Sequence, residues 1–177
     1  DQATKRRMDE AAALLLSEGA NAVQRIEDDA AKEILRRITD VPMEIKVGAN
    51  LAMKISIQSK SAARVSSECA DITVLGQKPD QLIDPGFGSI RLFWPEPDDN
   101  PNRAFGADQP VLEAIQKIRR IAHQYGGSAV VEHCPLDVKR QIDVWGDPPD
   151  SLKIMQAIKR RFDPEDILNP GRFLGGI

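Results

Sequence analysis

Hydrophobic residues recur at every third or fourth position in several stretches of the chain, a spacing that gathers side chains on one face of a helix. Met8, Ala11, Ala12 and Leu15 follow this spacing, and Gly19 is a natural stop. The predicted helices are residues 4–18, a helix from Asp28 or Asp29 that Pro42 ends, residues 59–70, residues 109–125, and a helix from Asp150 or Ser151 to Phe162. Their predicted inward faces are Ala31, Ile34, Leu35 and Ile38 in the second helix, Val111, Ile115, Ile118 and Ala122 in the fourth, and Leu152, Met155, Ile158 and Phe162 in the last.

A different pattern, strict alternation of apolar and polar residues, predicts half-buried strands. Residues 51–57 show it best, with Leu51, Met53, Ile55 and Ile57 as the apolar members. The predicted strands are residues 22–27, 51–57, 72–75, 87–94 and 128–133. Prolines and glycines between Pro79 and Gly86 predict a turn-rich connection, and residues 96–102 predict a surface loop.

The order of these elements from residue 49 to residue 133 is strand, helix, strand, strand, helix, strand, which is the split βαβ order of a ferredoxin-like fold. We therefore predict an α+β protein with an antiparallel sheet, helices on one face, and extra N- and C-terminal helices. The expected organisation is a domain over residues 1–148, with its core at 49–133, followed by a C-terminal helix and tail over residues 149–177.

The composition of the 177 residues is that of a single water-exposed globular domain, and a net charge of −3 argues against a nucleic-acid surface. No apolar run approaches the roughly 18 residues that span a bilayer, and the sequence leads us to expect no signal peptide. These features predict a cytoplasmic protein, with membrane association through partner subunits as an alternative. Because the chain opens at Asp1 without a methionine, we expect it to be part of a longer polypeptide.

Few residues suggest catalytic chemistry. Cys69 and Cys134 lack the spacing of a metal site. We expect both to be reduced, buried thiols, and a disulfide between them is the lesser alternative. His133 and Cys134 are neighbours in a predicted strand, where successive side chains point to opposite faces, so no metal site is expected. No catalytic residue can be assigned. A non-enzymatic ferredoxin-like interaction or regulatory domain therefore stays open as an alternative function.

The C-terminal tail carries the most specific pattern in the chain. Asp163 can cap a short helical turn, and the proline after Asn169 predicts extended backbone at Asn169. Pro170 and Gly171 stand where a type II turn requires them, and Arg172 follows. An amide and a planar cation on a rigid turn suit a ligand with carbonyl or phosphate oxygens.

Residues 159–172, Lys-Arg-Arg-Phe-Asp-Pro-Glu-Asp-Ile-Leu-Asn-Pro-Gly-Arg, resemble the C-terminal signature of FAD-linked oxidases of the vanillyl-alcohol oxidase superfamily. With residues 144–149, Val-Trp-Gly-Asp-Pro-Pro, and the final Gly-Gly-Ile, the tail is similar to that of the FAD-binding (E) subunits of bacterial glycolate oxidases. The resemblance covers roughly the last quarter of the chain; upstream of it the likeness is one of element order.

The resemblance implies a cap domain that covers a flavin held by an N-terminal FAD-binding domain outside this chain. It implies FAD in the full-length protein, a small 2-hydroxy acid as substrate, and further subunits of an oxidase complex as partners, with no nucleic acid. The residues that it places against the cofactor are Asn169, Pro170, Gly171 and Arg172. Since the flavin domain is outside this chain, we expect the 177 residues alone to fold without retaining FAD.

Overall fold

The computed structural model describes residues 2–95 and 109–177, and for residues 40–50 it describes the backbone alone. The chain divides into two compact units, Asp1–Pro42 and Met43–Ile177. The surface loop predicted for residues 96–102 lies outside the described residues.

The first unit consists of helix α1 (Gln2–Ser17) and the start of helix α2 (Asp28–Gly48). The predicted first helix is confirmed, but the predicted strand over residues 22–27 is wrong, because this segment is an irregular connection. A strand needs a hydrogen-bonded neighbour, and all the β-pairing in the described residues lies in the second unit.

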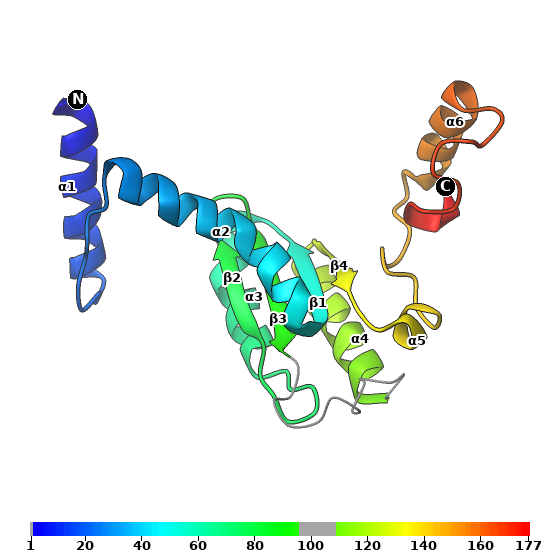
Figure 1. Ribbon diagram of the computed structural model, residues 1–177, viewed down its shortest axis with the longest axis horizontal. Coiled ribbons are helices and arrows are strands. Elements are labelled where there is room, and N and C mark those ends of the chain that lie inside the picture. The colour runs from blue at the N-terminus through cyan, green and yellow to red at the C-terminus, as the bar shows by residue number, and fades with distance from the viewer. Residues whose placement is uncertain (1, 96–108) are drawn as a thin grey trace. The chain divides into compact units, whose positions relative to one another are not determined.

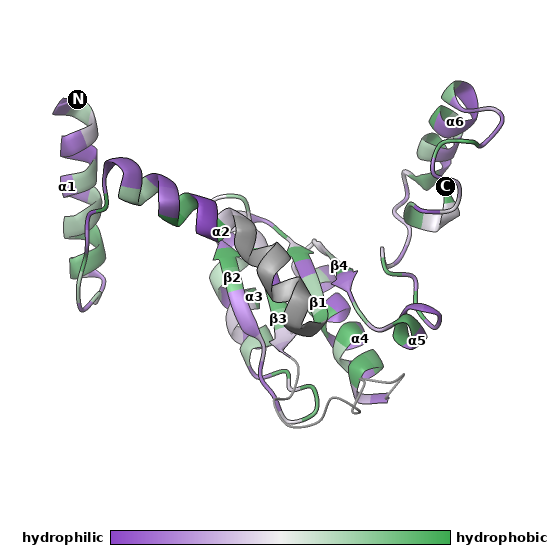
Figure 2. Cartoon of the chain, in the orientation of Figure 1, coloured by the Kyte–Doolittle hydropathy of each residue, from purple (hydrophilic) through white to green (hydrophobic). Residues whose placement is uncertain are grey.

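Helix α2 departs from its prediction in two ways. Its backbone continues through Pro42 to Gly48, because a helix can lose the one hydrogen bond that a proline removes. Its predicted inward face is also wrong: Ile34, Leu35 and Ile38 are 37, 63 and 47% exposed. Hydrophobic and hydrophilic positions alternate along α1 and the first turns of α2 (Figure 2). An amphipathic stripe is buried only where another element covers it.

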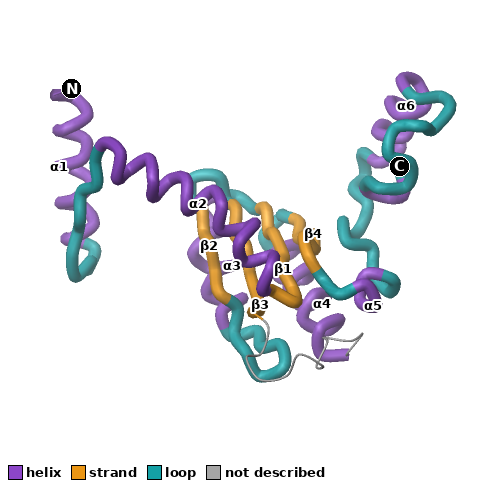
Figure 3. Tube along the Cα trace, viewed as in Figure 1, coloured by secondary structure: helices purple, strands orange, loops and turns teal. Residues whose placement is uncertain are grey.

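The second unit contains a four-stranded antiparallel sheet in the order β2-β3-β1-β4, drawn in orange in Figure 3. Its strands are β1 (Ala49–Ser56), β2 (Asp80–Asp84), β3 (Ser89–Pro95) and β4 (Ser128–His133). The turn η1 (Ser59–Ser61) and helix α3 (Ala62–Ala70) join β1 to β2, and helix α4 (Gln109–Gln124) precedes β4. Each pair of strands joined by a helix is separated by a strand of the other half, which confirms the predicted α+β, ferredoxin-like fold.

The core lies between one face of the sheet and helices α3 and α4 (Figure 1). Leu51, Met53 and Ile55 of β1 are fully buried there, opposite Trp94, Leu92 and Ile90 of β3 in the antiparallel register. Helix α4 adds its predicted inward face, all of it buried: Val111, Ile115, Ile118 and Ala122. The alternation in β1 and the helical spacing in α4 were thus sufficient to predict which of their residues face the core.

Two predicted strands are displaced. Residues 72–75 form only an isolated bridge between Val74 and Gln77, and the strand is instead β2, in the segment predicted as a connection. Val74 is nevertheless buried in the core, which explains its apolar character. Strand β3 starts at Ser89, so Phe87, predicted to be one of its apolar members, lies outside it and is 86% exposed.

After β4 the chain forms helix α5 (Leu136–Lys139), helix α6 (Leu152–Phe162) and the turn η2 (Leu174–Gly176). In α6, Leu152 and Met155 are half-buried, but Ile158 and Phe162 are 54 and 80% exposed, so their predicted inward orientation is wrong. No helix within residues 2–95 and 109–177 combines the length and the apolar content that crossing a membrane requires.

Candidate functional site

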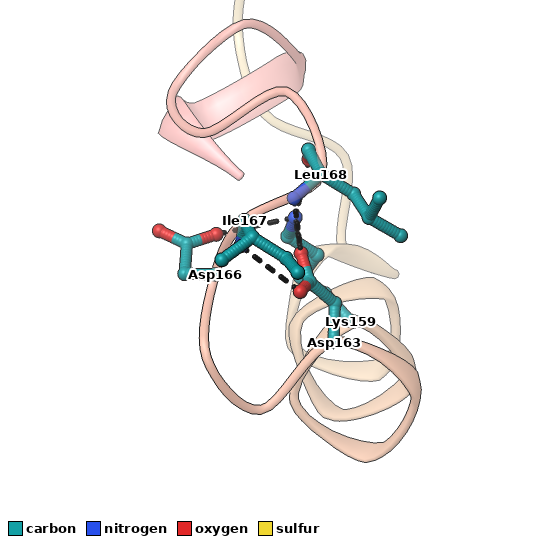
Figure 4. A network of polar contacts seen from close by, with 5 residues as sticks. All are labelled: Lys159, Asp163, Asp166, Ile167 and Leu168. Atoms are coloured by element: carbon teal, nitrogen blue, oxygen red, sulfur yellow. Dashed lines mark hydrogen bonds and ion pairs between the residues drawn. The ribbon is translucent and has the colours of Figure 1, made fainter.

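The tail after α6 is organised by one buried carboxylate, Asp163, which is 7% exposed. Its Oδ1 accepts a hydrogen bond from the amide of Ile167 at 3.0 Å, and its Oδ2 accepts one from the amide of Leu168 at 3.0 Å. The Lys159 ammonium donates to Asp163 and, at 2.6 Å, to the carbonyl of Leu168 (Figure 4). Lys159 also lies 3.1 Å from the Asp166 carboxylate.

Asp163 therefore does not cap a helical turn as predicted. The Asp166 amide donates to the Asp163 carbonyl at 3.1 Å and closes a turn at residues 164–165, and a second turn follows at residues 170–171. The Lys159 ammonium and the two amides lower the pKa of Asp163, and the Asp163 carboxylate in turn raises the pKa of Lys159. We call residues 163–173 the hook.

The four residues predicted to face the cofactor form the tip of the hook. The Arg172 amide donates to the Asn169 carbonyl at 3.3 Å, and Gly171 has a φ of 68°, as the predicted type II turn requires at that position. The extended backbone predicted for Asn169 is wrong, since its φ is 51°; asparagine is among the residues that best tolerate this left-handed region. Asn169, Pro170, Gly171 and Arg172 are all exposed.

Trp145 attaches the hook to the rest of the unit. Its indole Nε1 donates to the Arg172 carbonyl at 3.2 Å, and its ring meets that of Phe173 edge to face, with centroids 4.8 Å apart. The Trp145 amide donates to Asp143 Oδ1 at 2.9 Å. Trp145 belongs to the motif over residues 144–149 that carries part of the sequence resemblance. The resemblance did not indicate that Trp145 holds the hook.

The segment that contains Trp145 is itself fixed to the sheet. The Val131 amide of β4 donates to the Val144 carbonyl at 2.8 Å, and the Arg119 side chain of α4 donates to the Asp143 carbonyl. Val144 therefore occupies a hydrogen-bonding position on β4 that β1 does not use. Through these contacts the hook is positioned by the sheet and by α4.

Between β4 and the hook lies a cavity of 440 Å³, which we call the edge cavity. The residues that give it chemical character are Glu132, His133, Cys134, Lys139, Trp145 and Arg172. A second hollow of 660 Å³ shares Lys139, Trp145 and Arg172 with it. The edge cavity thus joins a predicted cofactor-facing residue, Arg172, to residues that lie far from it in the sequence.

A register shift in the pairing of β4 with β1 shapes the cavity wall. Met53 pairs with Val131 and Ala52 with His133, so Glu132 is left without a partner and bulges. Its Oε2 lies 3.5 Å from Nε of Arg91 on β3, across the intervening strand β1. Both atoms are buried and make no hydrogen bond, so the attraction between the two charges is what pairs these side chains.

His133 and Cys134 both line the edge cavity, as do the three residues before them. Cys134 is half-buried and packs against the core, whereas His133 is exposed. Cys69 and Cys134 are free thiols, the first buried and the second half-buried. Burial raises the pKa of Cys69 to about 11 and also raises the pKa of Cys134, so neither thiol is activated. Among the described residues, no group of three or more metal-ligating side chains is close enough to hold a metal ion.

The tip of the hook fits one part of a flavin site. Within the described residues, the Arg172 guanidinium and the Asn169 amide make no side-chain hydrogen bond or ion pair, so their donors point to solvent. Such donors match the carbonyl or phosphate oxygens of a flavin nucleotide. The exposed turn encloses nothing by itself, however, so it can supply only one wall of such a site.

Residues 99–173 match the model of the family described as FAD linked oxidases, C-terminal domain. The matched region includes α4, β4, α5, α6 and the hook as far as Phe173. Neither the curated proteins nor the solved structures contain a match to the chain. This part of the chain is therefore similar to the C-terminal domain of FAD-linked oxidases.

Proposed function

We propose that the chain is the C-terminal cap domain of an FAD-dependent oxidoreductase subunit of the glycolate oxidase type, which serves the oxidation of a small 2-hydroxy acid. The family match supports the cofactor and implies an FAD-binding domain as partner. In this proposal residues 1–148 form the cap and residues 149–177 return to the FAD domain. Other subunits of an oxidase complex complete the assembly.

One observation carries the proposal: the exposed Asn169–Arg172 turn is held in shape from both sides. Asp163 fixes the start of the hook through two amides and Lys159, and Trp145 fixes its end at the Arg172 carbonyl. A frayed terminus needs no buried carboxylate and no indole contact. A rigid turn with unused donors is what contact with a partner's ligand requires.

When bound, FAD supplies the redox chemistry, accepting two electrons from the substrate. The residues of this chain bind and orient. The Arg172 guanidinium and the Asn169 amide donate hydrogen bonds toward the flavin, and the type II turn keeps the two side chains together. No residue of the chain is assigned as acid, base or nucleophile.

The test is to join this chain to the FAD-binding domain that its family implies and to record the visible spectrum of the purified protein. We expect a yellow protein with bound flavin. A colourless protein that does not take up added FAD would contradict the proposal and favour a non-enzymatic interaction domain.

Arg172→Ala in the same protein tests the contact itself. If the guanidinium makes charge-assisted hydrogen bonds to the flavin, FAD binding should weaken by about 1–3 kcal/mol, which is about 5- to 150-fold in Kd. Arg160→Ala, which removes an exposed arginine from α6, is the control and should leave FAD affinity unchanged. Equal affinity of Arg172→Ala and the unmodified protein would remove Arg172 from the site.

A further inference from the structure

The edge cavity carries an excess of positive charge that no side chain in the described part of the chain neutralises. Lys139 and Arg172 both line it, and within the described residues neither side chain has a hydrogen-bond or ion-pair partner. Glu132 is the acidic residue among those that line the cavity, and its charge is offset by Arg91 at 3.5 Å. Two unpaired cations beside one neutralised carboxylate make this cavity attractive to an anion.

The position of Lys139 is supported by its effect on a neighbour. Its charge acts on the Cys134 thiol, where it opposes the rise in pKa that burial causes. The Lys139 ammonium is therefore close enough to Cys134 for its charge to act on the thiol. Arg140, the next residue, differs: it lies 3.3 Å from the Asp137 carboxylate and does not line the cavity.

The other cation is held in place through its own backbone. The Trp145 indole donates to the Arg172 carbonyl at 3.2 Å, so the guanidinium starts from a fixed point at the cavity rim. The indole also provides an apolar wall beside the two cations. Apolar walls with a few convergent charged groups are typical of small-molecule sites, and the volume of 440 Å³ lies within their usual range.

We propose that the edge cavity binds a small organic acid through its carboxylate, held between Lys139 and Arg172 against the Trp145 ring. The choice of a 2-hydroxy acid as the ligand rests on the proposed function. The excess positive charge is independent of the proposed function, because the charge follows from the residues that line the cavity. The carboxylate accepts hydrogen bonds from the Lys139 ammonium and from the planar donor fork of Arg172.

The experiment titrates the 177-residue chain with sodium glycolate and follows the indole N–H resonance of Trp145 by NMR. Sodium chloride at equal ionic strength is the blank, and sodium phosphate is a competing anion. We expect a saturable shift with glycolate and a weaker response to phosphate. Lys139→Ala should weaken glycolate binding about tenfold or more, because a charge-assisted hydrogen bond is lost.

Arg140→Ala is the matched control, since it removes the same charge one residue away from a side chain outside the cavity. It should change the glycolate affinity by less than about twofold, as expected for an exposed residue that is already paired. Equal losses in Lys139→Ala and Arg140→Ala would show general charge attraction and overturn the proposal. An absence of saturation would overturn it too, as would phosphate binding that is as tight as glycolate binding.

These outcomes are separate from those of the proposed function. If the chain binds glycolate but is colourless when joined to its FAD domain, the carboxylate site is supported and the flavoenzyme assignment is contradicted. If the joined protein is yellow but shows no saturable glycolate binding, the flavoenzyme assignment is supported and the carboxylate site is contradicted.

Discussion

Burying a carboxylate away from water costs free energy unless its oxygens accept hydrogen bonds from the protein. The Asp163 carboxylate accepts them from two backbone amides and from the Lys159 ammonium. Each of these partners lies within five residues of Asp163 in the sequence. The hook is therefore a local structure whose shape is determined mainly by one side chain. Substituting that side chain should disturb the hook without disturbing the sheet.

The hook should consequently lose its order in acid. The lowered pKa of Asp163 means that its contribution to stability is present above the unfolded pKa, about 3.9, and is lost as the pH falls through the lower folded value. We expect the amide resonances of Ile167 and Leu168 to move toward unfolded positions over that range. Asp163→Asn should show displaced resonances already at pH 7 and no acid step.

The exposed Asp150→Asn is the control for this titration and should reproduce the unmodified profile. If Asp163→Asn and the unmodified chain gave the same profile, the carboxylate could not be what organises the hook.

At the scale of elements, the buried residues of a helix or strand could be predicted where the pattern of its own sequence was sufficient. The spacing in α4 and the alternation in β1 were sufficient because each element has one clearly apolar face. It failed for β2, whose sequence Asp-Gln-Leu-Ile-Asp is polar at both ends, because β2 is an edge strand that owes its conformation to pairing with β3. It failed again for the inward face of α2, because periodicity shows which side of a helix is apolar but not whether anything covers it.

The turn between β2 and β3 contains a glycine on which the sheet depends. Gly88 has a φ of 63°, and a Cβ atom there would lie 2.0 Å from the carbonyl oxygen of Ile57, whose amide donates to the Gly88 carbonyl at 2.9 Å. Gly76 has a similar φ of 83° but open space around it. We expect Gly88→Ala to lower the free energy of unfolding by about 1–3 kcal/mol more than Gly76→Ala does, because only the first adds a clash with backbone.

Urea denaturation of the two variants measures this difference. The substitution at Gly76 controls for the left-handed backbone itself, which costs a non-glycine residue about 1–2 kcal/mol. Equal losses of stability would mean that the Ile57 backbone moves aside easily.

Trp145 links two elements, and its indole N–H can be removed while an aromatic ring is kept. Trp145→Phe should release the hook from the segment on β4, because the Arg172 carbonyl loses its donor. We expect trypsin to cleave after Arg172 several-fold faster relative to Arg25, which lies in the other unit. By contrast, Trp94→Phe, which removes an indole bond to the Ile72 carbonyl inside the core, should lower global stability by about 1 kcal/mol.

If cleavage after Arg172 were unchanged in Trp145→Phe, the indole contact could not be what holds the hook.

At the scale of the whole molecule, the candidate site shows why its residues were only partly predictable. The turn at Asn169–Arg172 could be predicted because glycine readily adopts the positive φ that Gly171 has there, although the extended backbone that Pro170 predicted for Asn169 was wrong. The edge cavity could not, because it depends on a bulge at Glu132, on Lys139 at the end of α5 and on the docking of Trp145. These residues lie close together only in the folded unit, and no local sequence pattern predicts their proximity.

The part of a site that these residues supply also determines what the chain can do alone. Its described residues position donors and cations on one side of a site, but the exposed turn at Asn169–Arg172 encloses no cofactor and no residue is placed as an acid or base. We therefore expect the isolated 177 residues to fold, to emerge colourless from gel filtration after incubation with FAD, and to show no glycolate-dependent reduction of an artificial electron acceptor. Rejoining the FAD domain should restore flavin retention, and Arg172→Ala should diminish it there. Retained flavin or glycolate turnover in the isolated chain would mean that these residues enclose the cofactor themselves, and the hook would then have to be reinterpreted as part of a complete site.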